Sequence, residues 1–126
     1  MYVYLAGPMQ KGHRMENLRR GIDAADRIAS RGHIVFCPHL NDIWHLLYPH
    51  DIEFWMKMDI AWVKKCDVLV RIHGYSQGAD REEQLARQWN KIVFGGEHID
   101  GLAEFMNSSY WCNTENPEDY SKSVGV

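Results

Sequence analysis

The sequence has few features of a secreted, membrane-bound or nucleic-acid-binding protein. Its three cysteines among 126 residues, Cys37, Cys66 and Cys112, are odd in number and lack CxxC spacing, which argues against a disulfide framework and a zinc site. No apolar run approaches the ~20 residues of a membrane helix, and the residues before the first glycine are too short for a signal peptide. The formal net charge of -3 gives no electrostatic case for binding a nucleic-acid backbone. A cytoplasmic setting fits best, with no nucleic-acid or membrane partner, and a small polar ligand remains open.

What is present is a regular alternation of strand-like and helix-like segments. We expect strands over 2–6, 33–37, 67–72 and 91–94, and helices over 15–31, 51–66, 78–89 and 99–106. Strand, helix and strand joined by tight turns make right-handed βαβ units with parallel strands. The predicted fold class is α/β: a three-layer α/β/α sandwich, flavodoxin-like or Rossmann-like, with a parallel sheet of four to five strands.

The domain organisation follows from where this alternation ends. We expect one α/β domain over 1–106, large enough to fold without disulfides or a metal. The remaining residues, 107–126, are polar but include Tyr110, Trp111 and Tyr120. Aromatic residues in such a tail suggest docking, for example onto a neighbouring subunit, so a homodimer or larger homo-oligomer is expected.

The chain is organised around residues 76–86, which follow the apolar run 67–72. This order describes a buried parallel strand, a loop at its carboxyl end and a helix whose first turn carries a carboxylate, that of Glu82. Ligands of open α/β sheets bind outside the carboxyl ends of the strands, and helix amino termini favour negative charge. We therefore expect Glu82 to be ionised at the mouth of a pocket.

Three other regions carry polar groups that suit a ligand site. The glycine-punctuated basic loop 9–14 is either a phosphate- or carboxylate-binding loop or a plain turn. The segment 38–49 is expected to be an irregular, substrate-facing or lid loop, in which Trp44 and His45 pack or stack. A metal-binding interpretation of His39, His45 and His50 is disfavoured by their spacing. Asp59, within a tryptophan-rich helix, is either exposed at the edge of the apolar face or directed into the cleft.

Together these residues resemble a known family. The matching segments, in order, are Tyr4-Leu5-Ala6-Gly7-Pro8-Met9, Arg31-Gly32-His33-Ile34-Val35-Phe36 followed by Pro38, Asp59, Cys66-Asp67, and Ser76-x-Gly78-Ala79-x-x-Glu82-x-x-x-Ala86. This pattern resembles the nucleoside 2-deoxyribosyltransferase-like superfamily, which includes the 2'-deoxynucleoside 5'-phosphate N-hydrolases and many small bacterial and phage proteins. The resemblance covers roughly residues 2–95.

The resemblance implies chemistry at an N-glycosidic bond. It implies that Glu82 is the nucleophile, that Tyr4 hydrogen-bonds and positions it, and that Asp59 contacts or protonates the departing base. Breaking the C1'–N bond develops positive charge on the sugar, which a carboxylate stabilises or traps, and the base leaves more easily when an acid protonates it. The substrate-binding candidates are Gly7, Pro8, Arg14, Ser76, Gly78, Trp44 and His45, and no metal or other cofactor is implied.

The chain departs from the family pattern at several points. Glu83 lies beside Glu82, but the spacing from Ser76 favours Glu82. The first loop lacks the serine and paired glycines of the nucleotide hydrolases, so Lys11, His13 or Arg14 would have to recognise a 5'-phosphate. Asn113 and Asn116 are candidates for the asparagine that transferases donate across a subunit interface.

The sequence is therefore consistent with two main classes of function. The leading one is an enzyme, a nucleoside or nucleotide N-glycosidase or a 2-deoxyribosyltransferase, acting through a glutamate glycosyl intermediate. The alternative is a non-catalytic nucleotide-binding or signalling module with the same fold. An interaction protein that works through its aromatic loop and tail is a third, weaker hypothesis.

Overall fold

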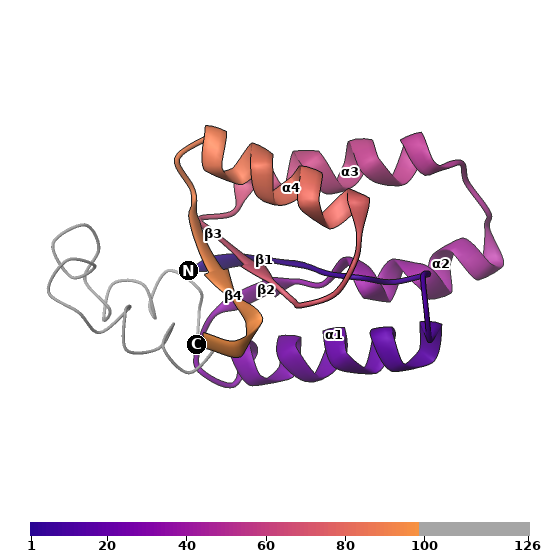
Figure 1. Ribbon diagram of the computed structural model, residues 1–126, viewed down its shortest axis with the longest axis horizontal. Helices are drawn as coiled ribbons and strands as arrows, with labels where there is room; N and C mark the ends of the chain where they lie inside the picture. Colours follow the sequence, from indigo (N-terminus) through magenta and orange to yellow (C-terminus); the bar gives the residue numbers. More distant parts are fainter. Residues whose placement is uncertain (99–126) are drawn as a thin grey trace, which may run out of the picture.

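The computed structural model describes residues 1–98, which form a parallel β-sheet with helices on both faces (Figure 1). The strands are β1 (Tyr2–Ala6), β2 (Ile34–Phe36), β3 (Val68–Arg71) and β4 (Ile92–Gly95), in the order β2-β1-β3-β4. The helices are α1 (Arg14–Ala29), α2 (Asn41–Leu47), α3 (Ile52–Lys65) and α4 (Gln77–Gln88), with short 3₁₀ turns at Pro38–Leu40 and Gly96–His98. The predicted α/β/α class and the parallel sheet of four to five strands are confirmed.

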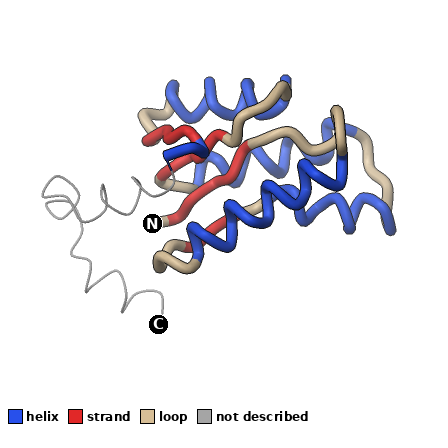
Figure 2. Tube along the Cα trace, turned by 60° about the horizontal axis from the view of Figure 1, so that its bottom comes forward, coloured by secondary structure: helices blue, strands red, loops and turns tan. Residues whose placement is uncertain are grey.

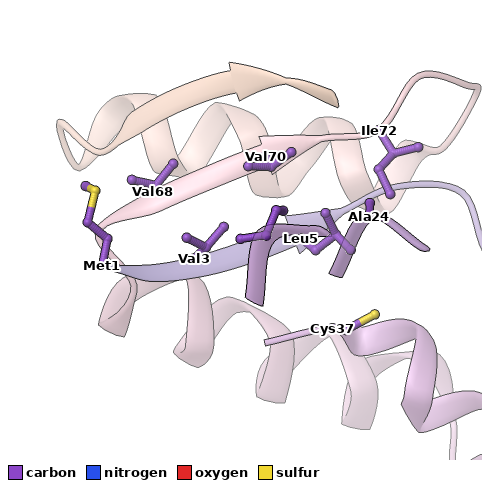
Figure 3. Packing of buried hydrophobic residues seen from close by; sticks show 9 residues of the cluster. Met1, Val3, Leu5, Ala24, Cys37, Val68, Val70 and Ile72 are labelled. Carbon is purple, nitrogen blue, oxygen red and sulfur yellow. The ribbon is translucent and has the colours of Figure 1, made fainter. Parts of the chain in front are cut away.

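The two faces of β1 belong to two different hydrophobic cores. Val3 and Leu5 pack with Val68 and Val70 of β3 and with Ala24 of α1 in one cluster, which Figure 3 shows. Their neighbours Tyr4 and Ala6 point to the opposite face, as the period of two in a strand requires. Figures 1 and 2 show α1 on one side of the sheet and α3 and α4 on the other. Tyr4 therefore lies between the sheet and the helices α3 and α4.

The helices α3 and α4 each bring one acid into this second core. The buried residues of α3 are Asp59 and Val63, which are one turn apart on a single face. The buried residues of α4 are Ala79, Glu82 and Ala86, again on one stripe. An acid thus occupies a position in each helix where helical periodicity would ordinarily place an apolar side chain.

Strand order places a ligand crevice between β1 and β3. The chain passes from β1 to β2 on one side and then crosses to β3 on the other side of β1, so the order reverses there. The loops that follow β1 and β3 touch: a Cβ at Gly7 would lie 2.8 Å from the Ile72 Cβ, and one at Gly74 would lie 2.6 Å from the Pro8 Cγ. Gly74 also has a φ of +132°, which L-residues rarely adopt.

One expectation about secondary structure was wrong, and other expectations concern residues outside the described part of the chain. The segment 38–49 is not irregular: it forms the 3₁₀ turn Pro38–Leu40 and the helix α2. A helix this short is marginal alone, and ring contacts of Trp44 with α3 stabilise it. Several expectations concern residues outside 1–98: the helix 99–106, the domain end at 106, the tail 107–126, Asn113 and Asn116.

Within residues 1–98, no helix has the length and apolar character needed to cross a bilayer.

Candidate active site

A cavity of about 350 Å³ opens at the carboxyl ends of β1 and β3. Its volume is that of a small-molecule site. Residues 7–11 after β1 and 75–78 before and within α4 form two of its walls. The other walls come from the segment 38–59, through Pro38, Asn41, Asp42, His45, His50, Ile52, Trp55, Met56 and Asp59.

Tyr4, Asp59 and Glu82 form a buried acidic cluster next to this cavity. The Tyr4 hydroxyl donates a hydrogen bond of 2.6 Å to Glu82 Oε2. Tyr4 is 0% exposed, Asp59 4% and Glu82 5%. Asp59 lines the cavity itself, whereas Tyr4 and Glu82 lie behind its lining. The structure therefore brings together the three residues that the sequence named as catalytic candidates.

Burial changes the protonation of Glu82 from what the sequence led us to expect. The pKa of Glu82 is raised to about 8, and burial is the main cause. The Tyr4 hydrogen bond and the Arg71 guanidinium lower this pKa, and the Asp59 carboxylate raises it. Glu82 is therefore protonated at pH 7 in the unliganded protein, and the expectation of an ionised carboxylate at a pocket mouth was wrong. The physical reason is position: the first-turn acid of α4 is Asp80, whereas Glu82 lies in the second turn, facing the core.

Asp59 has the environment of a general acid. Burial raises its pKa to about 7, so a proton is available near neutral pH. Its Oδ1 has no hydrogen-bond partner among the described residues. An unpaired buried carboxyl oxygen in a cavity wall is costly unless a ligand or water meets it. Of the two interpretations of Asp59, the structure supports the one in which it faces the cleft.

The tyrosine is held as a hydrogen-bond donor. Its pKa is raised well above the usual value, first by burial and then by the Glu82 and Asp59 carboxylates. A phenol in this position keeps its proton at any physiological pH. Tyr4 therefore fixes one oxygen of Glu82 and leaves the other oxygen free for chemistry.

Most of the predicted substrate-binding residues line the cavity. Gly7, Pro8, His45, Ser76 and Gly78 are all in its walls. Ser76 is also the N-cap of α4, where its hydroxyl oxygen accepts a hydrogen bond of 3.1 Å from the Ala79 N–H. Because that oxygen acts as acceptor, the hydroxyl proton remains available to a ligand.

Two predicted residues, Arg14 and Trp44, are not in the cavity walls. Arg14 forms an ion pair with Asp42, with 2.9 Å between Arg14 Nε and Asp42 Oδ2. Its guanidinium is therefore engaged by an acid that itself lines the cavity. Trp44 packs edge-on against Trp55, with 5.2 Å between ring centroids. Both residues support wall residues rather than forming the wall.

Trp44 belongs to an aromatic cluster that joins α2 to α3 and is made of Trp44, His45, His50, Phe54 and Trp55. His50 stacks on Phe54 with 3.7 Å between centroids, and Trp55 meets His45, His50 and Phe54 edge-on. Within the cluster, His45 Nδ1 accepts hydrogen bonds from the Trp55 indole N–H at 2.9 Å and from the His50 backbone N–H at 3.2 Å. The cavity wall formed by α2 and α3 is thus held in one arrangement.

The histidines considered for a metal are engaged with other groups. His39 is buried and donates from Nε2 to the Pro8 carbonyl oxygen at 3.2 Å. This bond holds the loop after β1 at the cavity. Residues 1–98 contain no group of three or more His, Cys, Asp or Glu side chains arranged to hold a metal ion.

The structure also separates Glu82 from its neighbour Glu83. Glu83 is on the outer face of α4, where Oε2 pairs with Arg87 at 3.1 Å and Oε1 approaches Arg71 Nε at 3.7 Å. Glu82 alone faces Tyr4. Adjacent residues of a helix point about 100° apart, so this separation was predictable from sequence.

Sequence reasoning missed several residues of the cavity. Tyr75 is one of them: it lines the cavity together with Lys11, the residue considered above for phosphate recognition, whose Nζ lies 4.8 Å from the centroid of the Tyr75 ring. Trp55 was visible to sequence analysis because it precedes Asp59 by one helical turn and shares its face. Asn41 carried no such signal, since the helix α2 that presents it was not predicted.

Most of the chain matches one known protein family. Residues 1–94 match the family described as a domain of unknown function, DUF4406. The chain belongs to the DUF4406 family. No curated protein shows significant sequence similarity to this DUF4406 chain.

One solved structure places the DUF4406 fold among known ones. It is the 2-deoxyribosyltransferase of the psychrotolerant bacterium Bacillus psychrosaccharolyticus. The two sequences are 24% identical, and the match covers 75% of this chain and 71% of the transferase chain, with a TM-score of 0.60. The DUF4406 chain therefore has a nucleoside 2-deoxyribosyltransferase-like fold, as the resemblance in its sequence implied. At this level of identity the likeness concerns the fold.

Proposed function

We propose that this protein cleaves or transfers the N-glycosidic bond of nucleosides, deoxynucleosides or their 5'-monophosphates. The observation that carries the proposal is the buried pair of Tyr4 and Glu82, joined at 2.6 Å, beside the cavity acid Asp59. Two carboxyl groups are the usual equipment for glycosidic bond cleavage, one as nucleophile and one as acid. The nucleoside 2-deoxyribosyltransferase-like fold supports the same class of substrate.

In the proposed first step, Glu82 is the nucleophile and Asp59 the acid. The free carboxylate oxygen of Glu82 attacks C1' of the sugar, and the C1'–N bond breaks with its electron pair going to the base. The proton of Asp59 passes to the departing base, which leaves neutral. Tyr4 keeps its own proton and orients Glu82 through the hydrogen bond.

The second step returns the protein to its starting state. A water molecule in the hydrolase, or a second base in the transferase, attacks C1' of the glycosyl-enzyme. The Asp59 carboxylate takes the proton from the attacking group, and Glu82 leaves as a carboxylate. The Tyr4 hydroxyl keeps its proton and donates its hydrogen bond to Oε2 of the released carboxylate, as before the reaction.

Protonation of the pair suits this cycle. The reaction needs one proton on Asp59 and none on Glu82, and the two pKa values of about 7 and about 8 hold one proton between the carboxyl groups near neutral pH. Positive charge that develops on the bound sugar favours the form in which Glu82 is ionised. The Arg71 guanidinium, which lowers the pKa of Glu82, acts in the same direction.

Release of free base tests the proposal. The protein is incubated with a panel of deoxynucleosides, ribonucleosides and their 5'-monophosphates, with and without an added acceptor base, and the products are separated by chromatography. We expect base release or exchange with at least one substrate, and its loss by ~10³-fold or more in Glu82→Ala, as for removal of a covalent nucleophile.

The neighbouring residue provides a matched control. Glu83→Gln changes the same helix at a side chain outside the cavity lining and is expected to leave base release within about threefold of the parent, because its ion pair with the 62%-exposed Arg87 contributes little. Undiminished base release in Glu82→Ala would remove Glu82 as nucleophile. Thermal stabilisation by nucleosides without any base release would favour the non-catalytic binding module.

The setting and assembly of the protein are part of the same proposal. We propose a cytoplasmic homodimer or larger homo-oligomer. The helix α2 leaves Ile43, Leu46 and Leu47 62%, 75% and 68% exposed, and exposed apolar patches commonly mark interfaces. Sedimentation of the full chain measures the assembly directly.

A further inference from the structure

The wall of the cavity formed by α2 includes His45, a side chain whose hydrogen bonds to other residues use only one of its two ring nitrogens. His45 and Asn41 both line the cavity and are four residues apart in α2, so they lie on one face of that helix. The Asn41 Nδ2 has no partner among the described residues but is buried behind the wall surface, so His45 is the residue that can offer a donor to a ligand. Nothing in the proposed reaction uses either side chain.

The proton of the neutral His45 ring is assigned by its surroundings. Two N–H groups, the Trp55 indole and the His50 backbone amide, donate to Nδ1. An imidazole nitrogen that accepts hydrogen bonds carries no proton, so the proton of the neutral ring is on Nε2. No residue among 1–98 accepts a hydrogen bond from this Nε2 in the structure. The aromatic cluster therefore holds His45 as a donor with a free N–H.

We propose that His45 selects bases that present acceptors, so that the site prefers 6-oxopurine nucleosides to 6-aminopurine nucleosides. This inference rests on the proposed nucleoside substrate. A 6-oxopurine shows two acceptors, O6 and N7, on one edge, whereas adenine shows N7 and a donor amino group. An N–H donor facing an amino group leaves both donors unpaired, and buried unpaired donors are costly.

Two substitutions separate the roles of the two ring nitrogens. In His45→Asn, the side-chain oxygen replaces Nδ1 as acceptor for Trp55, and the Nε2 donor is lost. In His45→Gln, the amide nitrogen replaces Nε2 as donor, and the acceptor for Trp55 is lost. His45→Asn therefore keeps the hydrogen bond that holds the aromatic cluster and loses the preference for 6-oxopurines. His45→Gln keeps part of that preference.

Binding is measured in the Glu82→Gln background, so that no substrate is consumed, with deoxyinosine and deoxyadenosine as probes in titration calorimetry. We expect deoxyinosine to bind about tenfold or more tightly than deoxyadenosine. His45→Asn should bring the two dissociation constants within about twofold by weakening deoxyinosine alone, and His45→Gln should retain a preference for deoxyinosine. Base release by the protein with Glu82 intact is measured separately on the same two nucleosides.

Each other outcome overturns the inference in a recognisable way. Equal affinity for the two nucleosides in the parent removes the selection itself. If His45→Asn weakens the binding of both nucleosides equally, His45 shapes the cavity wall and does not distinguish the two bases. Base release without any preference overturns the inference and leaves the proposed function intact, whereas neither binding nor release of any nucleoside in the panel overturns both.

Discussion

At the scale of single residues, the site depends on two acids whose protons are controlled by burial. Glu82 and Asp59 each occupy a helix position that faces the sheet, and burial is the first cause of the raised pKa of both. The Tyr4 hydrogen bond works against this effect at Glu82. A carboxyl group that is desolvated but also hydrogen-bonded is able to exchange its proton near neutral pH.

The pH dependence of base release follows from these two groups. In the proposed mechanism the active form has one proton on the pair, so kcat/KM should rise as the pH approaches about 7 and fall above about 8, the values of the two pKa. Initial rates from pH 5 to 10 measure this profile. Asp59→Asn should abolish the bell shape as well as most of the rate, and a flat profile in the parent would contradict the assignment of acid and nucleophile.

At the scale of secondary-structure elements, the amino termini of α3 and α4 position the site. Each helix begins with a side-chain cap: Asp51 Oδ1 accepts from the Phe54 N–H at 2.9 Å, and Ser76 Oγ accepts from the Ala79 N–H at 3.1 Å. The caps stabilise the first turn of each helix. The buried stripes that contain Asp59 in α3 and Glu82 in α4 decide which face packs on the sheet.

The two caps give a matched pair of variants. Asp51→Ala and Ser76→Ala should each lower the free energy of unfolding by about 1 kcal/mol, measured by urea denaturation. Only Ser76 lines the cavity, so Ser76→Ala should also reduce base release while Asp51→Ala leaves it near the parent. Ser76→Thr, which retains a hydroxyl, should restore the stability. Equal losses of activity in both alanine variants would show that Ser76 acts through the helix alone.

At the scale of the whole molecule, the buried acids reduce stability as the pH rises. In the unfolded chain Glu82 loses its proton near its ordinary pKa of 4.5, whereas the folded chain keeps that proton up to about pH 8. Between these values the folded state binds more protons than the unfolded state, so the stability contributed by the protonated group is lost progressively as the pH rises. The site is thus maintained at the expense of stability at neutral and alkaline pH.

Removing the charge at Glu82 should therefore stabilise the protein in one pH range. Glu82→Gln is expected to unfold at a temperature close to that of the parent at pH 5 and at least about 4–8 °C higher at pH 8, since each kcal/mol has about that effect in a domain of this size. Thermal unfolding monitored by circular dichroism at both pH values checks this. A constant difference between the two proteins across the pH range would mean that Glu82 has no raised pKa.

The sequence by itself determined the alternation of strands and helices, the parallel sheet and the choice of Glu82 and Asp59 as candidate acids. Local signals suffice for these features, because period-two and period-3.6 patterns, the serine cap and the family motif are all readable along the chain. Only the tertiary structure decided that Glu82 is protonated, that Arg14 is engaged by Asp42, and that 38–49 contains a helix. Desolvation, ion pairing and the stabilisation of a short helix by Trp55 depend on residues distant in sequence. For the same reason, the direction of the His45 donor became visible only once α2 and α3 were packed together.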